Sequence, residues 1–579
     1  MKKYTYVKNC LSGKLTILLL LLFVSTINAQ THKNDTTLNR TVVVEQEYNP
    51  DIMDASKINL LPNIEEPTIK KQKVEYDTSI SPLVSFGSVN AMQPFTLKNL
   101  QPDAKKGYAH LGYGNKGNVD AKFNYLFDLS TKDRLNIFAL LKGINTELMI
   151  PGDITNGNIE IPWNTRYYKS DAGVDYLHLF DKINMNISGR LGADVFNYHQ
   201  IEPTSSVYSD KQNHTKGNIH LGIESTDETL PIQFQLETNY LYFNKKYNRP
   251  DSSSNKETLL RTKANVFAFI SDQQCIGINA EMNNQLYTLP SYKNYTSLQL
   301  NPYYTFEKNT WKFRLGAHVD LTLGKESSIN IAPDLEAQYL FAKSFLFYMK
   351  ANGGTKINDF RQIESENPYW DPSVQANNSF NKLDGVIGLK ASPIGNVWFD
   401  LFGGYKITDN NLCFINYNQL IDRLAYSNFI EEDTKSLYAG VQIKYQQKGL
   451  FSVSAKGTYY HWDADHNEAL LAKPQFEFEA NTEANISANL SCSLNYSYTS
   501  RKEVTLYYSD PSSLASINNL LFSYKMKPIS NLSLGINYKL FNGISIFAKL
   551  NNLLNQKYQY YYSYPVEQIN FIGGLSFQF

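Results

Sequence analysis

The chain has 579 residues, of which 13% are aromatic and 19% charged, with 55 basic and 55 acidic side chains. This balance leaves no basic surplus of the kind that nucleic-acid-binding proteins carry, so we expect no nucleic-acid partner. Beyond the N-terminus no stretch of about 18 apolar residues occurs, which excludes transmembrane helices from that part of the chain.

The first 29 residues have the pattern of a signal peptide. Four lysines accompany an apolar run, Leu15 to Val24, that is too short to anchor a protein in a bilayer, and Ala29 suits a cleavage site. We therefore predict that residues 1–29 are removed on export. The rest of the chain has 51 basic residues (55 less these four) against 55 acidic ones, a net charge of −4.

The exported part offers no recognisable catalytic motif. Its sequence has no nucleophile elbow, no Walker-type phosphate loop and no HExxH zinc motif. Its cysteines, Cys275, Cys413 and Cys492, are too widely spaced for a disulfide framework or a zinc cluster. The sequence therefore predicts a protein that is not an enzyme, with no cofactor, no catalytic residue and no metal ligand.

Apolar and polar residues alternate along most of the chain. In "WKFRLGAHVDL", Trp311, Leu315 and Val319 fall on one face of an extended strand, whereas Lys312 and Arg314 fall on the other. This alternation predicts strands with one apolar and one polar face. The same pattern recurs in 183–195, 437–445, 490–498 and 571–579.

Three features favour a membrane barrel over a water-soluble sandwich. The expected strands are longer than the five or six residues that are usual in soluble sheets. Charged pairs occupy the face that a packed core would exclude but a wet lumen accepts. Tyrosine and phenylalanine gather near strand ends, as in 301–306 and 457–462, like the aromatic girdles of membrane interfaces. We predict an all-β fold, a transmembrane antiparallel β-barrel.

Turn residues predict the number of strands. Ten short turns and eleven other connections join about 22 strands, an even number that leaves both ends of the chain on one side. The short turns are expected near 130–133, 181–182, 227–230, 272–274, 307–309, 342–343, 393–395, 447–449, 485–489 and 541–543. Long outer connections are expected at 148–166, 200–213, 246–257, 358–380, 408–433, 501–528 and 555–567.

The prediction divides the chain into three parts. The signal peptide is followed by an extended periplasmic segment, 30–104, and by the barrel, 105–579. The run "INNLLFSYKM", 517–526, resembles a further strand, but we place it within an outer connection.

The C-terminal sequence resembles a known family. The stretch "IFAKLNNLLNQKYQYYYSYPVEQINFIGGLSFQF", Ile546 to Phe579, is similar to the last two strands of TonB-dependent outer-membrane receptors of the Bacteroidetes type. Asn551 to Asn555, with Lys557 and Tyr558, look like the penultimate strand of that family. Phe579 looks like its C-terminal signal for the barrel-assembly machinery. The resemblance implies a barrel in outer-membrane lipid and a role in transport.

The expected N-terminal segment departs from this family. Its receptors carry a plug domain that fills the lumen before the barrel begins. Here residues 30–104 are punctuated by proline and lack apolar periodicity, so we expect an extended arm and no plug. A lumen of this width must then be narrowed by the arm, by outer connections that fold inward or by a separate partner.

One short segment of the arm resembles a TonB box. Thr41, Val42, Val43 and Val44 form a β-branched run, which the family adds as a strand to its energy-coupling protein. Residues 40–51 are therefore a candidate contact for TonB or for another periplasmic or outer-membrane protein. The alternative is that the run pairs with any free sheet edge or with the barrel itself.

Two other segments have competing interpretations. In 461–469, "HWDADHNEA", the acids and the histidines His461 and His466 are candidate cation ligands, but we favour a solvated acidic loop because the EF-hand pattern is incomplete. In 558–565, "YQYYYSYP", the aromatic side chains could stack on a flat ligand. We favour an interface girdle or a loop-packing cluster.

Two functional hypotheses remain for an outer-membrane protein with these parts. In the first, the chain is a transport or receptor barrel that is coupled to TonB through Thr41–Val44. In the second, it is a plugless structural or assembly barrel whose arm recruits periplasmic or outer-membrane partners.

Overall fold

The computed structural model describes residues 105–151, 160–199, 210–227, 229–246, 255–325, 327–342, 344–371, 374–415, 427–447, 449–508, 520–561 and 564–579. The predicted signal peptide, the arm 30–104 and the segment Thr41–Val44 lie outside the described residues. Among the described residues, no helix is long and apolar enough to cross a membrane.

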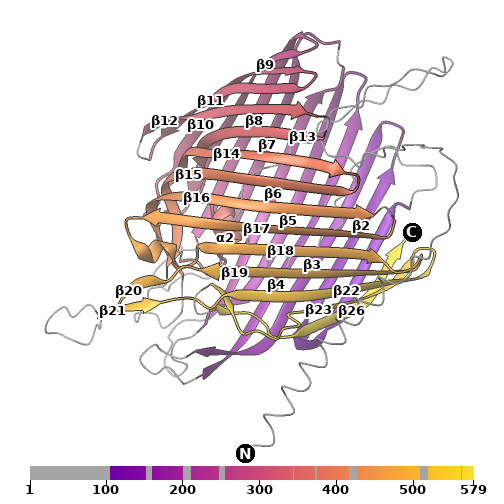
Figure 1. Cartoon of the computed structure of the whole chain (residues 1–579), viewed down its shortest axis with the longest axis vertical. Coiled ribbons are helices and arrows are strands. Elements are labelled where there is room, and N and C mark those ends of the chain that lie inside the picture. The colour runs from indigo at the N-terminus through magenta and orange to yellow at the C-terminus, as the bar shows by residue number, and fades with distance from the viewer. Residues whose placement is uncertain are drawn as a thin grey trace, which may run out of the picture. The chain divides into compact units, whose positions relative to one another are not determined.

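Twenty-two strands form one sheet (Figure 1). They are β1 (Gly107–Gly114), β2 (Val119–Asp128), β3 (Asp133–Pro151), β4 (Glu160–Leu179), β5 (Ile183–Asn197), β6 (Lys211–Ser225), β7 (Gln233–Lys245), β8 (Asn255–Ser271), β9 (Gln274–Tyr287), β10 (Tyr295–Lys308), β11 (Trp311–Leu323), β12 (Ser328–Phe341), β13 (Phe345–Lys356), β14 (Ser379–Ile394), β15 (Val397–Ile415), β16 (Asn428–Gln447), β17 (Phe451–Ala464), β18 (Pro474–Asn485), β19 (Leu490–Arg501), β22 (Ile529–Phe541), β23 (Ile544–Asn551) and β26 (Asn570–Gln578).

The remaining described elements are short and lie in the connections. They are η1 (Asn115–Gly117), α2 (Phe360–Glu366), η3 (Asn467–Leu470), β20 (Val504–Tyr508), β21 (Leu520–Tyr524), β24 (Gln559–Tyr561) and β25 (Tyr564–Pro565).

Every strand of the large sheet pairs antiparallel with the next one along the chain, and the ring closes where β1 pairs with β26. At this seam Tyr108 lies opposite Gln578, and Gly114 lies opposite Ile572. Closure leaves no unpaired edge, which is the condition for a sheet to cross a bilayer. The predicted fold class and the predicted number of strands are confirmed.

The ten short turns lie within a few residues of their predicted places, and all connect strands at one end of the barrel. The described part of the run 517–526, from Leu520 onward, also lies in a long connection as predicted, where β21 forms a two-stranded sheet with β20 instead of joining the barrel.

The strands are longer at the other end than the sequence predicted. The expected connections 148–166 and 408–433 contain regular strand, because β3 runs to Pro151 and β16 begins at Asn428. The longest strands, β4 and β16, have 20 residues each. A tilted strand needs only about 9–11 residues to cross the bilayer, so these strands continue beyond it.

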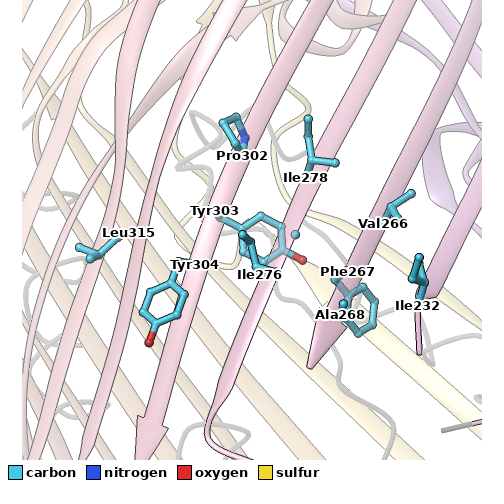
Figure 2. A pocket seen from close by; sticks show the side chains of 11 residues that line it. Ile232, Val266, Phe267, Ala268, Ile276, Ile278, Pro302, Tyr303, Tyr304 and Leu315 are labelled. Carbon is cyan, nitrogen blue, oxygen red and sulfur yellow. The ribbon is translucent and has the colours of Figure 1, made fainter. Parts of the chain in front are cut away.

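The outer face of the barrel is apolar. Leu191 is 72% exposed and Ile329 is 71% exposed, although both are strand residues. Exposed side chains of Val266, Ile276 and Leu315 line a shallow apolar hollow across β8 to β11 (Figure 2). Such a surface would be a liability in water, but it matches a hydrocarbon environment.

The inner face is polar and charged, as the alternation predicted. Arg314 binds Asp334 with 2.7 Å between Nε and Oδ2, and its guanidinium lies 3.9 Å from the centre of the Tyr303 ring. Further cross-strand ion pairs line the same face. Paired charges of this kind suit a wet lumen better than a packed core.

Candidate functional site

The β13–β14 connection, 357–378, folds into the barrel. Figure 1 shows its helix, α2, within the outline of the strands. Asp359 caps the helix by accepting a hydrogen bond from the backbone N–H of Gln362 at 2.8 Å. Asn367 ends it, and Pro368 follows, where a proline cannot continue a helix. The local sequence therefore dictates a single short helix inside this connection.

Apolar side chains of the connection pack against the barrel wall. Phe360, Ile363 and Trp370 are each no more than 2% exposed. The ring centre of Phe360 lies 5.8 Å from that of Phe243 on β7 and 5.0 Å from that of Trp370. Because these contacts exclude water, the connection is a packed part of the fold and not a surface loop.

A buried cluster of charges joins α2 to the wall. The Lys216 ammonium on β6 lies 2.5 Å from Glu364 Oε2 and 2.6 Å from Asp194 Oδ2 on β5. His214 Nδ1 lies 2.9 Å from Glu364 Oε1. Each carboxylate of this buried group has a charged or hydrogen-bonding partner, which a buried charge requires.

Further contacts attach the connection to β6, β7 and β8. Arg361 donates to the backbone oxygens of Gly217 and Tyr242, and burial lowers the pKa of its guanidinium. Arg261 on β8 binds Asp359 with 2.9 Å between Nη2 and Oδ2. Lys245 donates to the Trp370 backbone oxygen at 2.8 Å. The connection thus reaches strands five to seven positions away from β13 around the sheet.

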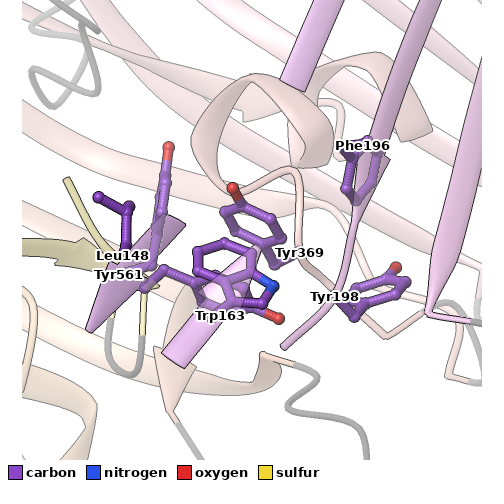
Figure 3. Close-up of a cluster of buried hydrophobic side chains, with 7 residues drawn as sticks. Leu148, Trp163, Phe196, Tyr198, Tyr369 and Tyr561 are labelled. Atoms are coloured by element: carbon purple, nitrogen blue, oxygen red, sulfur yellow. The ribbon is translucent and has the colours of Figure 1, made fainter. Parts of the chain in front are cut away.

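A second packed cluster brings other outer connections onto this one (Figure 3). The Tyr369 ring stacks on Tyr564 of the β23–β26 connection with 3.6 Å between centres and 7° between planes. The Tyr369 and Asp371 backbones also pair with Ser427, which precedes β16. Tyr561 and Tyr564 of the segment 558–565 therefore contribute to loop packing, one of the two interpretations that the sequence favoured.

Three residues of the charged cluster have the composition of a metal site. Ligand atoms of Asp194, His214 and Glu364 lie within 4.8 Å of one another. However, the Lys216 ammonium contacts both carboxylates and supplies the positive charge that a cation would bring. The donor set therefore does not fit a resident metal ion.

The acidic segment 461–469 is divided between elements. His461 and Asp463 belong to β17, and only the residues from Asp465 onward lie in the connection, so the predicted start of this loop was wrong. The exposed His466 binds Glu432 of β16, with 3.0 Å between Nδ1 and Oε2. This hydrogen bond raises the pKa of His466 above its usual 6.5.

We expect Glu432→Gln to lower the pKa of His466, because the neutral amide removes both the ionic hydrogen bond and the nearby charge. In the native protein this contact stabilises the fold below pH 6.5, and its contribution is lost as the pH rises through the raised pKa. An NMR titration of the imidazole Cε1–H measures the shift. Asp465→Asn should change the pKa of His466 less than Glu432→Gln does. An unchanged pKa of His466 in Glu432→Gln would contradict the assignment of the raised pKa to Glu432.

Phe579, the candidate signal for the barrel-assembly machinery, lies among the described residues. It follows β26, it is 54% exposed, and its backbone N–H donates to Gly107 at 3.0 Å. The run Asn551–Asn555 is not a strand: β23 ends at Asn551, and Asn552 and Asn555 take left-handed φ angles of 49° and 52°. That part of the prediction was wrong because left-handed residues turn the chain out of the ladder.

The sequence did not predict the residues of the charged cluster as a site. Asp194 was recognised only as a polar position of its strand, and His214 and Glu364 are 150 residues apart. The available signal was local: Asp359 with Gln362 three residues later is a capping pattern inside a segment that was expected to be irregular.

Comparisons with known proteins agree with this architecture. No family model and no curated protein matches the chain. Solved structures do: the siderophore receptor PirA from Acinetobacter baumannii has a TM-score of 0.64 at 10% identity, over 83% of this chain and 81% of that one. The FrpB iron transporter from Neisseria meningitidis has a TM-score of 0.61 at 11% identity, over 83% and 82%.

A third match is the pyoverdine outer membrane receptor FpvA from Pseudomonas aeruginosa PAO1, with a TM-score of 0.60 at 11% identity over 83% of this chain and 80% of that one. At such low identity, the likeness concerns the fold. The chain therefore has the barrel fold that these receptors and this transporter share.

Proposed function

We propose that the chain is a receptor-like barrel of the bacterial outer membrane with a role in transport, and that it is not an enzyme. The observation that carries this proposal is a closed 22-stranded barrel with an apolar exterior and a charged lumen, similar in fold to a siderophore receptor and an iron transporter. Substrates of those proteins define the class to test first, which is chelated metal ions.

In this proposal residues 30–104 lie in the periplasm, and Thr41–Val44 add as a strand to TonB. The Bacteroidetes-type resemblance of the C-terminal sequence supports this assignment. Phe579, exposed at the end of the closing strand, is proposed as the signal for the barrel-assembly machinery.

Deletion of 41–45 from the full chain should abolish energised uptake and TonB binding while the barrel still inserts. Val43→Pro should have the same effect, because proline removes a backbone donor from the added strand. Val43→Thr, which keeps a β-branched side chain, is the matched control. Uptake of iron chelates and co-purification with TonB are the two readouts. Normal values for the 41–45 deletion and for Val43→Pro would refute TonB coupling.

A structural or assembly barrel that recruits partners is the second candidate. It is favoured by the packed β13–β14 connection at the end of the barrel where the long connections lie, the long-connection mouth, because Phe360, Ile363 and Trp370 are buried there against the wall. Purification from native membranes in mild detergent should then recover stoichiometric partners that are lost when residues 40–51 are deleted. A monomer without partners would contradict this alternative.

A further inference from the structure

We propose that the β13–β14 connection is a built-in barrier to solutes at the long-connection mouth of the barrel, and that Glu364 latches it to the wall. This inference concerns permeability and does not depend on the proposed transport role. It assigns the closure of the lumen to the described residues of this connection, 357–371 and 374–378.

The width of the barrel requires a barrier. Barrels of about 16–18 strands already leave an aqueous channel, so 22 strands enclose a lumen that their own side chains cannot fill. Without a barrier the outer membrane would leak small solutes. Part of the chain or a partner must therefore occupy the lumen.

The connection leaves its own two strands and reaches other parts of the wall. Pairing of β13 with β14 is complete at Lys356 and Ser379, so everything between them is available to leave the wall. From there the connection reaches β5, where the Tyr369 ring lies 5.6 Å from the Phe196 ring, and β8, where Asp359 binds Arg261. Contacts over this arc place backbone and large side chains across the interior.

The connection is packed against its surroundings on several sides. Trp370 is fully buried between strands and the rest of the connection, and Tyr369 is held by the stacked Tyr564. The parallel bridge from Trp370 to Ser427 adds backbone pairing with a second connection. A segment held in this way does not yield to a diffusing solute.

The latch joins α2 to strand β6 of the wall. Glu364 is the α2 residue that reaches both His214 and Lys216 on β6. These wall residues are polar and lie on the lumen face, so water can solvate them if the connection leaves. The wall itself is closed by strand pairing, which does not involve the connection. The barrel should therefore survive release of the connection.

The test is the ionic conductance of the full chain in a planar lipid bilayer. Replacing 360–371 by a glycine–serine segment of equal length should raise the conductance roughly tenfold, because a wide barrel then loses its barrier. The control replaces the β20–β21 hairpin in the same way, since Figure 1 shows that hairpin beyond the barrel rim. The control should conduct like the native protein.

A milder pair of variants keeps the test decisive if the replaced chain does not fold. Glu364→Lys puts a second cation beside Lys216 and should raise the conductance, whereas Asp465→Lys, at an exposed acid of another connection, should not. Heat-modifiable migration in gels confirms that each barrel is folded. Folded Glu364→Lys and glycine–serine variants with native conductance would overturn the proposal, since the barrier would then lie elsewhere. Loss of iron-chelate uptake alone would concern the proposed transport role and not the barrier.

Discussion

Lys216→Met should destabilise the closed position of α2 by about 3–5 kcal/mol, the usual cost of removing one partner from a buried ion pair. The Lys216 side chain is only 12% exposed, and its ammonium is shared between Asp194 and Glu364. Without it, two carboxylates lie together in a buried site that retains no cation between them. Repulsion should push α2 away from the wall.

Hydrogen exchange of the amides in 357–371 measures this effect. A cost of about 3–5 kcal/mol corresponds to an exchange rate that is faster by roughly a hundredfold to a few thousandfold, if local opening controls exchange. Amides of the barrel strands should exchange as in the native protein, because the strand ladder is intact.

The control variant removes the positive charge of Lys216 together with the negative charges of its two carboxylate partners. In the triple variant Lys216→Met, Asp194→Asn, Glu364→Gln, no carboxylate is left unpaired, and most of the lost protection should return. His214 keeps an oxygen partner in that variant, because a glutamine side chain still accepts a hydrogen bond. Equal exchange in the native, single and triple variants would mean that the charged cluster does not hold the connection.

Leu315→Arg should reduce the stability of the barrel in lipid by about 2–4 kcal/mol, whereas Leu323→Arg on the same strand should cost about 0–1 kcal/mol. Both side chains are more than half exposed on the apolar outer face. The difference comes from depth, since an arginine near the bilayer centre must be dehydrated and one at the interface remains solvated.

The aromatic side chains near the short turns mark one membrane interface, and the depth of the other residues is measured from it. Trp311 stacks on Tyr339 with 4.1 Å between ring centres and marks the interface on that side. For a strand tilted by about 45°, Leu315 lies roughly 9 Å from Trp311 along the membrane normal and Leu323 roughly 28 Å away, at or beyond the opposite interface.

Urea unfolding from lipid vesicles compares the two variants directly. Equal losses of stability would place Leu323 inside the hydrocarbon and would require a different membrane position for the barrel. A loss in Leu323→Arg alone would reverse the depth assignment.

The sequence predicted the barrel well where each strand has lipid on one side and water on the other. Under those conditions alternation is enforced residue by residue, and Lys312 and Arg314 do face the lumen opposite Trp311. It predicted strand ends poorly at the long-connection mouth. In β15, Leu412, Cys413 and Ile415 are all buried, although successive side chains of a strand point to opposite faces. Alternation then disappears, and the end of a regular strand resembles a loop.

The charged cluster could not be predicted for a different reason. Its members lie on β5, β6 and α2, and each is unremarkable in its own segment. Only the path of the β13–β14 connection brings them together. That path is set by burial of Phe360 and Trp370, which flank Glu364 but lie far from Asp194 and His214 in sequence. The short helix was the part that local capping residues encoded.

The seam between β1 and β26 has a consequence for biogenesis. β1 is the first strand of the barrel and β26 is the last, and at the seam Tyr108 lies opposite Gln578. The contact therefore joins segments that almost the whole sequence of the barrel separates. No other pairing in the sheet spans such a distance along the chain, and the cost of closing so long a loop falls on the final step of assembly. Until that step, both seam strands present free backbone groups that other nascent chains can capture. The maturation of this barrel is therefore most vulnerable to aggregation when it is almost complete, and a chaperone or insertase that shields the two edges would act at that stage.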